Sequence, residues 1–138
     1  MRRLFLCIAL SLTSSVVLAG ELCASDFASF LSKFESTRAF QRQNTRFPLL
    51  VSYVDKSALP EARTVQYKIG STSDPKYSGI IYPSKTKQAV VPFEKAVRSD
   101  QEKILVQFTK PDTDYSFAFV FEKTASCWQL VKFEDYSL

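Results

Sequence analysis

The 138-residue sequence contains no histidine, three glycines, one methionine and one tryptophan. Without an imidazole, every serine, cysteine or metal mechanism that needs histidine as base, proton shuttle or ligand is excluded. The glycines, Gly20, Gly70 and Gly79, are too scattered to build a phosphate-binding loop. What the sequence has is 46% hydrophobic and 14% aromatic residues, which is enough apolar surface for the core of one small domain.

The N-terminus has the three parts of an export signal. Met1-Arg2-Arg3 is basic, residues 4–12 are mostly apolar, and Val17-Leu18-Ala19 is typical of a cleavage site. We therefore predict a signal peptide over residues 1–19, cut before Gly20, and a single domain over residues 20–138 that is periplasmic or secreted. The alternative is an uncleaved membrane anchor, but serine and threonine interrupt the apolar run well short of roughly 20 residues. The general secretory route is favoured over the twin-arginine route.

Removal of the signal changes the charge balance. With Arg2 and Arg3 gone, 16 basic residues face 14 acidic ones. Nucleic-acid-binding domains carry a larger and more concentrated basic surplus, so no nucleic-acid partner is predicted. No stable membrane anchor would remain after cleavage.

The cysteine count predicts one disulfide. Cys7 leaves with the signal, and an exported protein with two remaining cysteines is expected to pair Cys23 with Cys127. The bond would close a loop of about 105 residues, which the chain-entropy model values at roughly 4 to 5 kcal/mol at most. Two free thiols or an intermolecular bridge are the alternatives.

The hydrophobic pattern predicts helices first and strands afterwards. Phe27, Phe30, Leu31 and Phe34 have the spacing of one buried helical face, and a second short helix is expected from Phe40 to about Asn44, stopped by Phe47-Pro48. Strands are predicted around residues 51–53, 65–69, 104–109, 115–123 and 128–135. A loop is expected at 70–75, a further short strand at 78–82 and a helical turn at 92–98. The last three strands are separated by short turns, which favours antiparallel neighbours. These elements predict an α+β fold, with N-terminal helices packed on one face of a curved antiparallel sheet in a cone-shaped roll.

Three segments carry a resemblance to a known family. They are Phe40-Gln41 followed by Arg46-Phe47-Pro48-Leu49, the closing run from Trp128 to Asp135, and the helix from Asp26 to Phe34. Together they resemble uncharacterised exported bacterial proteins with a nuclear-transport-factor-2-like (NTF2-like, cystatin-like roll) fold. The resemblance implies a fold and an exported setting. It assigns no catalytic residues, because this fold carries enzymes and binding modules alike.

Aromatic residues offer one candidate site. Tyr115, Phe117, Phe119 and Phe121 place four rings on one face of a strand, where they could line a pocket for an apolar or sugar ligand. The alternative, which we favour, is that the first helix packs directly on them. Trp128 is likewise expected to pack against the first helix and the disulfide.

Charged residues offer a second candidate. Arg38, Arg42 and Arg46 would form a basic stripe if the second helix extended through all three, and such a stripe could bind carboxylates or phosphates of a partner. The simpler interpretation of the three arginines is a solvated helix face. Lys85 and Lys87 could add to such a basic surface, but we expect them to keep a loop or sheet edge soluble. The acidic pairs Asp112/Asp114 and Glu134/Asp135 are expected to serve turns and surface charge. No metal or other cofactor site is predicted.

Two function hypotheses follow. The first is a non-enzymatic exported module that binds another protein, for example as an inhibitor or immunity protein of a toxic enzyme, with the three arginines in contact. The second is a small-ligand-binding protein, or a carboxylate-dependent enzyme, with its site inside the cone.

Overall fold

The structure, a computed structural model, describes residues 26–58, 60–80, 82–100, 102–125 and 127–138. The predicted signal over residues 1–19 and Cys23 lie outside these ranges, so the cleavage site and the disulfide stay predictions. Within the described ranges, no helix is both long enough and apolar enough to cross a membrane.

Two helices open the described chain, as the periodicity predicts. Helix α1 (Phe27–Phe34) begins where the Asp26 carboxylate accepts a hydrogen bond of 2.8 Å from the backbone N–H of Ser29. It buries the Phe30, Leu31 and Phe34 side chains. Helix α2 (Arg38–Gln43) is capped in the same way by the Thr37 hydroxyl.

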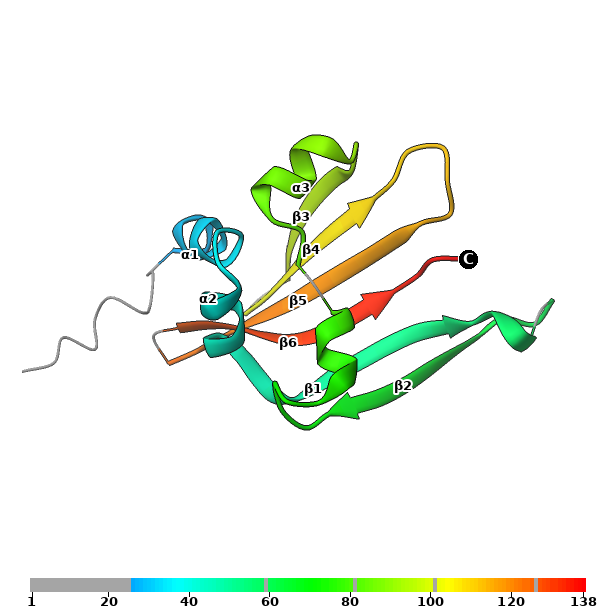
Figure 1. The fold of residues 1–138 in the computed structure, drawn as a ribbon, viewed down its shortest axis with the longest axis horizontal. Helices are drawn as coiled ribbons and strands as arrows, with labels where there is room; N and C mark the ends of the chain where they lie inside the picture. The colour runs from blue at the N-terminus through cyan, green and yellow to red at the C-terminus, as the bar shows by residue number, and fades with distance from the viewer. Residues whose placement is uncertain (1–25, 59, 81, 101, 126) are drawn as a thin grey trace, which may run out of the picture.

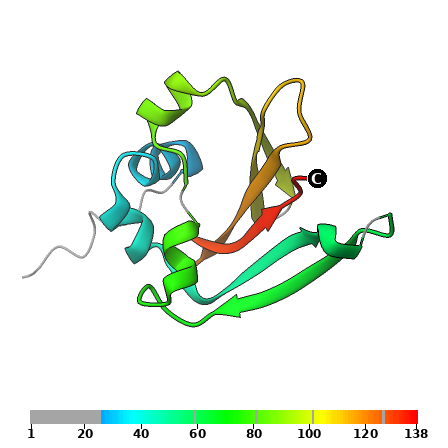
Figure 2. The same cartoon turned by 45° about the vertical axis from the view of Figure 1, so that its right-hand side comes forward.

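Six strands form one curved sheet (Figure 1). In chain order they are β1 (Thr45–Asp55), β2 (Arg63–Ile69), β3 (Glu94–Asp100), β4 (Lys103–Thr109), β5 (Ser116–Thr124) and β6 (Cys127–Asp135). Their order across the sheet is β2-β1-β6-β5-β4-β3. The β4–β5 and β5–β6 neighbours are antiparallel, which confirms the predicted order of the last three strands. The α+β prediction is confirmed, with the helices gathered on the concave face of the sheet (Figure 2).

The sheet is mixed rather than wholly antiparallel, which corrects one prediction. Strand β1 runs parallel to β6, with Val51 opposite Phe133, while every other neighbouring pair is antiparallel. The antiparallel β1–β2 hairpin thus joins the sheet beside the last strand of the chain. Hydrophobic alternation is the same in both strand directions, so the sequence pattern could not reveal this pairing.

The role predicted for Pro48 is also wrong. Strand β1 begins at Thr45, so Pro48 lies inside a strand and does not end helix α2. The register of β1 against β6 shifts between Thr45 and Leu50, which is where Pro48 sits. Proline lacks a backbone donor and is tolerated in sheets at such irregular positions.

The segment between β2 and β4 differs most from expectation. The short strand expected at 78–82 is absent from the described residues there, and a 3-10 helix, η3 (Pro75–Gly79), precedes it. The helix falls at α3 (Lys85–Val90) and not at 92–98, where β3 begins. All seven residues of β3 are exposed, so this strand has no apolar alternation by which to recognise it. A further 3-10 helix, η2 (Lys56–Ala58), follows β1.

The aromatic strand packs into the core. Phe119 and Phe121 on β5 are fully buried. The Phe121 ring centroid lies 5.1 Å from that of Phe34, 5.4 Å from Phe27 and 5.7 Å from Phe30, mostly edge to face. Phe117, at 6% exposure, is also buried, so three of the four rings belong to the core. Direct packing of α1 on this strand is shown for Phe121.

Trp128 closes the same end of the core. Its ring lies 5.1 Å from that of Phe27, so the predicted contact with the first helix forms. Cys127 precedes it at the start of β6, and its pairing with Cys23 remains a prediction.

Candidate functional site

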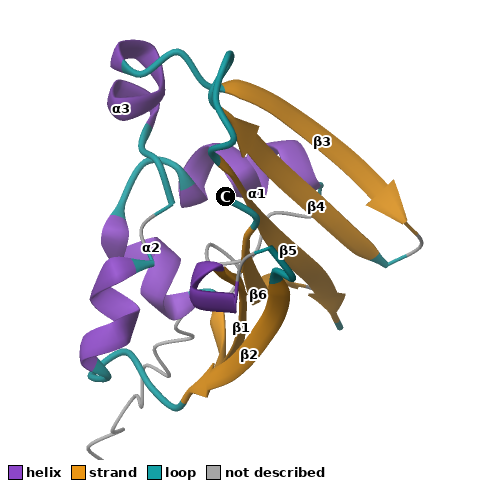
Figure 3. Ribbon diagram, turned by 90° about the vertical axis from the view of Figure 1, so that its right-hand side faces the viewer, coloured by secondary structure: helices purple, strands orange, loops and turns teal. Residues whose placement is uncertain are grey.

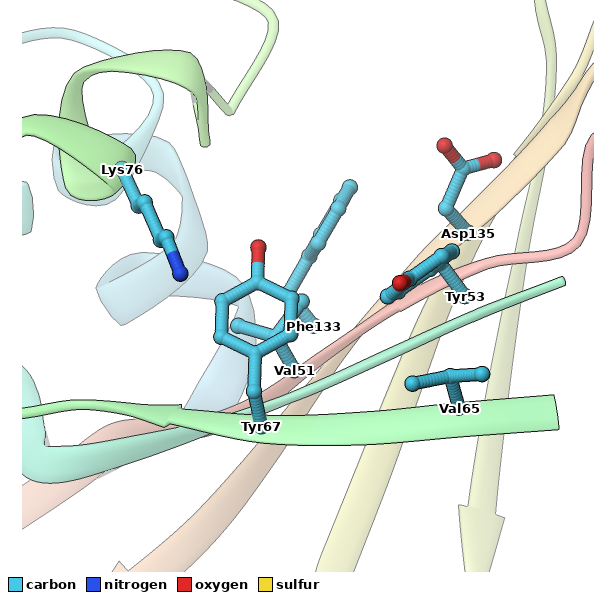
Figure 4. A pocket seen from close by; sticks show the side chains of 7 residues that line it. All are labelled: Val51, Tyr53, Val65, Tyr67, Lys76, Phe133 and Asp135. Atoms are coloured by element: carbon cyan, nitrogen blue, oxygen red, sulfur yellow. The ribbon is translucent and has the colours of Figure 1, made fainter. Parts of the chain in front are cut away.

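The concave face holds an open pocket of about 560 Å³ that the helices leave uncovered. We call it the main pocket; its lining residues are Val51, Tyr53, Val65, Tyr67, Lys76, Phe133 and Asp135 (Figure 4). Strands β1, β2 and β6 supply all of them except Lys76, which comes from η3. Exposure rises along β1 from 2% at Val51 to 38% at Tyr53, so the pocket opens toward the end of β1.

Two tyrosines form one wall of the main pocket. Tyr53 and Tyr67 are on neighbouring strands, and their ring centroids lie 6.0 Å apart at an interplanar angle of 66°. Partial burial, with smaller contributions from Tyr53 and Asp74, raises the pKa of Tyr67 above its ordinary value. The Tyr67 hydroxyl therefore stays protonated at neutral pH and can both donate and accept a hydrogen bond.

Lys76 brings a positive charge to this wall. Its Nζ atom lies 4.8 Å from the centroid of the Tyr67 ring, a cation–π geometry. Figure 4 shows the Lys76 side chain extending from its helix toward Tyr67. The helix η3 is itself held at its start, because the Asp74 carboxylate accepts a 2.9 Å hydrogen bond from the Lys76 backbone N–H. In the described part of the chain, the Lys76 ammonium has no carboxylate within ion-pair distance.

Asp135 supplies the carboxylate of the main pocket. It ends β6 next to Tyr53, with which it is paired in register. One carboxylate oxygen accepts a 3.0 Å hydrogen bond from the backbone N–H of Ser137, which fixes the side chain. Of the pair Glu134/Asp135, expected at the surface, Asp135 thus lines a pocket, while Glu134 accepts hydrogen bonds from Lys132 and Tyr136.

A second, smaller pocket adjoins the first and shares Phe133 with it. Its volume is about 140 Å³, and Tyr115 and Phe117 are among its lining residues. Tyr115 is 46% exposed, whereas Phe117, Phe119 and Phe121 are buried. Of the four rings predicted as one set, Tyr115 is the exposed one, Phe117 is a core ring that borders the smaller pocket, and Phe119 and Phe121 lie wholly in the core.

Arg38 makes several contacts within the domain. Its guanidinium donates to the carbonyl oxygens of Ile80 at 3.0 Å and Tyr77 at 3.3 Å, and lies 4.9 Å over the Tyr77 ring. The Tyr77 hydroxyl is 3.2 Å from that of Thr45. These contacts tie η3 to α2 and β1, and so position Lys76 at the main pocket.

Arg42 and Arg46 lie on two different elements. Helix α2 ends at Gln43, so Arg46 is on β1, where it makes a 2.5 Å ion pair with Glu122 of β5. Arg42 is exposed on α2. Contact of Arg38, Arg42 and Arg46 with a partner protein stays a prediction, but the continuous helical stripe on which it rested does not form.

Sequence reasoning missed most of the main pocket. Tyr53 and Tyr67 were recognised only as buried-face positions of two strands, and Lys76 was assigned to no site. One signal was present: these strands place hydroxyl-bearing rings on the same face as aliphatic side chains, which is unusual for a dry core. In the described ranges, no group of three or more cysteine or carboxylate side chains is placed to hold a metal ion.

A crystal structure of an NTF2-like protein from Bacteroides fragilis is similar to this chain, with a TM-score of 0.61 and 18% sequence identity. The match covers 82% of this chain and 47% of the other, so this chain spans about half the length of that structure. No family model and no curated protein matches the chain.

The fold is therefore NTF2-like, as the sequence resemblance implied. Helices covering one part of a curved sheet leave concave space at its other part, and such space is a scaffold for ligand-binding or enzymatic sites. At this level of identity the similarity concerns the fold alone.

Proposed function

We propose that the protein is a non-enzymatic binding protein that takes a small organic ligand in the main pocket. The ligand would present an apolar ring face to the tyrosine wall and an anionic group, such as a carboxylate, to Lys76. One observation carries the proposal: the Lys76 ammonium lies 4.8 Å over the Tyr67 ring, at the edge of a pocket of about 560 Å³.

The dimensions and chemistry of the pocket support this class of ligand. Small-molecule sites usually measure about 300 to 1,000 Å³ and combine apolar walls with a few polar groups. Here Tyr53, Tyr67 and Phe133 supply ring surfaces, and Asp135 can accept a hydrogen bond from a ligand hydroxyl or amine. An anion beside Lys76 would gain a charge-assisted contact without displacing an existing ion pair.

The titratable side chains that line the main pocket favour ligand binding over catalysis. Hydrolysis by paired carboxylates needs two such groups at a controlled separation, and Asp135 is the single carboxylate among the lining residues. The sequence contains no histidine to serve as a general base.

We also propose that the protein acts outside the cytoplasm, on the strength of its N-terminal sequence. Expression of the full chain in a bacterium should deliver the protein to the periplasmic fraction. Intact-mass measurement should then show a chain that begins at Gly20. Retention in the cytoplasm with residues 1–19 attached would contradict export.

A fluorescent aromatic anion provides a direct test of the pocket. Anilinonaphthalene sulfonate has a ring face and a sulfonate, and its emission rises in apolar surroundings. We expect saturable binding by the wild-type protein. Lys76→Gln should weaken it about tenfold, the equivalent of about 1.4 kcal/mol, and Tyr67→Leu should weaken it by removing the ring contact.

The matched control is Lys68→Gln. Lys68 is on the same strand as Tyr67 but pairs with Leu50 on the opposite, convex face, so this variant should bind the probe as the wild type does. Circular dichroism would show that all variants are folded. Equal binding by the four proteins, or no saturable binding, would rule out the main pocket as the site.

A further inference from the structure

Strand β3 forms an open edge of the sheet. It pairs with β4 on one side only, and Figure 3 shows no described element along its outer side. All seven of its residues are exposed, and Val97 keeps 53% of its surface in contact with solvent. An exposed strand edge is a template for pairing with another chain.

The backbone hydrogen bonds show which residues face the open edge. The Lys110 N–H donates to the Tyr115 carbonyl at 3.0 Å, and the Lys123 N–H donates to that of Glu102 at 3.2 Å. The backbone N–H and C=O groups of successive strand residues point alternately to the two neighbouring strands. Those of the even-numbered residues of β4 therefore point to β5, and those of the odd-numbered residues point to β3. Through the β3–β4 register, the backbone groups of Lys95, Val97 and Ser99 then point outward, away from β4.

Charge restricts how two copies of this edge could pair antiparallel. A register centred on Val97 sets Glu94 opposite Asp100, and registers centred on Lys95 or Arg98 set like charges opposite each other. A register centred on Ser99 sets Arg98 opposite Asp100 but pairs only three residues of β3. A register centred on Ala96 pairs five, and it sets Glu94 opposite Arg98, twice by symmetry, and Lys95 opposite Val97. Opposite charges at such facing positions stabilise strand pairing and like charges oppose it.

The side chains needed for the Ala96 register are available. Glu94 and Arg98 are exposed, and neither has an ion-pair partner within the described ranges. Lysine usually protects an edge strand by keeping its charge in solvent, but Lys95 turns inward and pairs with Glu35. Its aliphatic stem is left to cover Val97 of a second copy.

We propose that the protein forms a symmetric dimer in which the two β3 strands pair antiparallel about Ala96. The two sheets would then join into one, with both concave faces on the same side. The contact is confined to one short strand and its side chains, so the dimer is weak and depends on protein concentration.

The test exploits the two Glu94–Arg98 pairs. The protein is expressed as the full chain, purified, and studied by analytical ultracentrifugation up to millimolar concentration. Glu94→Arg alone sets two arginine pairs in opposition, and Arg98→Glu alone sets two glutamate pairs in opposition. Each variant should dimerise at least about tenfold more weakly than the wild type. An equimolar mixture of the two variants restores both attractive pairs, so it should form a heterodimer.

Lys68→Glu on β2, the other edge strand, is the control with the same charge change as Arg98→Glu, and it should leave dimerisation unchanged. Three outcomes would overturn the proposal: a wild-type protein that stays monomeric at every concentration, a dimer insensitive to both variants, or variants that fail to associate when mixed. Circular dichroism of each variant on its own would show that it is folded, so that failure of the mixture to associate could not be attributed to misfolding.

Discussion

The Glu35 carboxylate at the end of α1 accepts hydrogen bonds from the Lys95 ammonium on β3 and, at 3.1 Å, from the Tyr82 hydroxyl. The Glu35 side chain is 7% exposed and that of Lys95 is 28% exposed. The ion pair thus spans the concave face, from the first helix to the edge of the sheet. Gln88 of α3 donates a third hydrogen bond to the same carboxylate oxygen, so four separate segments meet at Glu35.

Removal of Lys95 alone should be costly. Lys95→Met would leave a buried carboxylate without its cation, and we expect a loss of about 3 kcal/mol in the free energy of unfolding. The double variant Glu35→Gln/Lys95→Met removes both charges and keeps a neutral acceptor for Tyr82, so it should lose less. Urea denaturation at neutral pH measures both values. Glu35→Gln alone completes the cycle, and a double variant that loses as much as Lys95→Met and Glu35→Gln lose together would show that the pair is not coupled.

Substitutions in and next to β5 should destabilise the protein strongly at a core ring and only slightly at an exposed ring that lines a pocket. Phe121→Ala removes a fully buried ring that contacts three phenylalanines of α1, so it should destabilise the protein by about 3 to 5 kcal/mol. Tyr115→Ala, at a ring that is 46% exposed, should cost less than about 1 kcal/mol. Thermal or urea unfolding of the two variants gives the comparison. Similar losses at both positions would contradict the division of these rings between core and pocket lining.

The Arg46–Glu122 pair should make stability depend on acid pH. The hydrogen bond from Arg46, aided by Lys103, holds the pKa of Glu122 below its ordinary value of 4.5. A lowered pKa in the folded state contributes stability above the unfolded value, and this contribution disappears as the pH falls through the lowered pKa. For a partly exposed pair we expect about 0.5 to 1 kcal/mol.

Arg46→Met should therefore be less stable than the wild type at neutral pH, and the difference should shrink as the pH falls below about 4.5. Urea denaturation across this pH range provides the measurement. Arg42→Met, at an exposed arginine without an ion pair in the described part of the chain, is the matched control and should track the wild type. A difference between Arg46→Met and wild type that is constant with pH would exclude the Glu122 carboxylate as its cause.

The predicted disulfide can be tested independently of every proposal about function. If Cys23 and Cys127 are paired, reductant should lower the melting temperature of the exported protein, and Cys23→Ser/Cys127→Ser should reproduce the loss without reductant. The chain-entropy model sets an upper value of roughly 4 to 5 kcal/mol for a loop of this length. Peptide mapping without reduction would identify the linked pair. An unchanged melting temperature would argue for two free thiols.

Local patterns were sufficient for much of the fold. The spacing of Phe27, Phe30 and Phe34 identified α1 because a helix repeats its buried face every three to four residues. Strands β4, β5 and β6 were recognised because each is buried on the concave face and alternates in period two. The burial of Phe119 and Phe121 followed from the same reasoning, since a helix face and a strand face of matching apolar character are expected to pack together.

Features that depend on distant parts of the chain required the tertiary structure. The parallel pairing of β1 with β6 leaves no trace in either strand, since alternation carries no direction. Strand β3 is exposed and has no periodic pattern of apolar residues by which to recognise it. The predicted arginine stripe does not form, because β1 begins two residues after helix α2 ends. The main pocket arose from one nonlocal arrangement. Arg38 holds η3 through the Tyr77 carbonyl, and η3 places Lys76 over Tyr67, in a pocket that Asp135 lines from β6, at the end of the sheet that the helices do not cover. Sequence alone thus determined which faces must be buried, because burial follows local periodicity. Only the three-dimensional packing decided where the concave face remained open, because that depends on contacts between residues far apart in the chain.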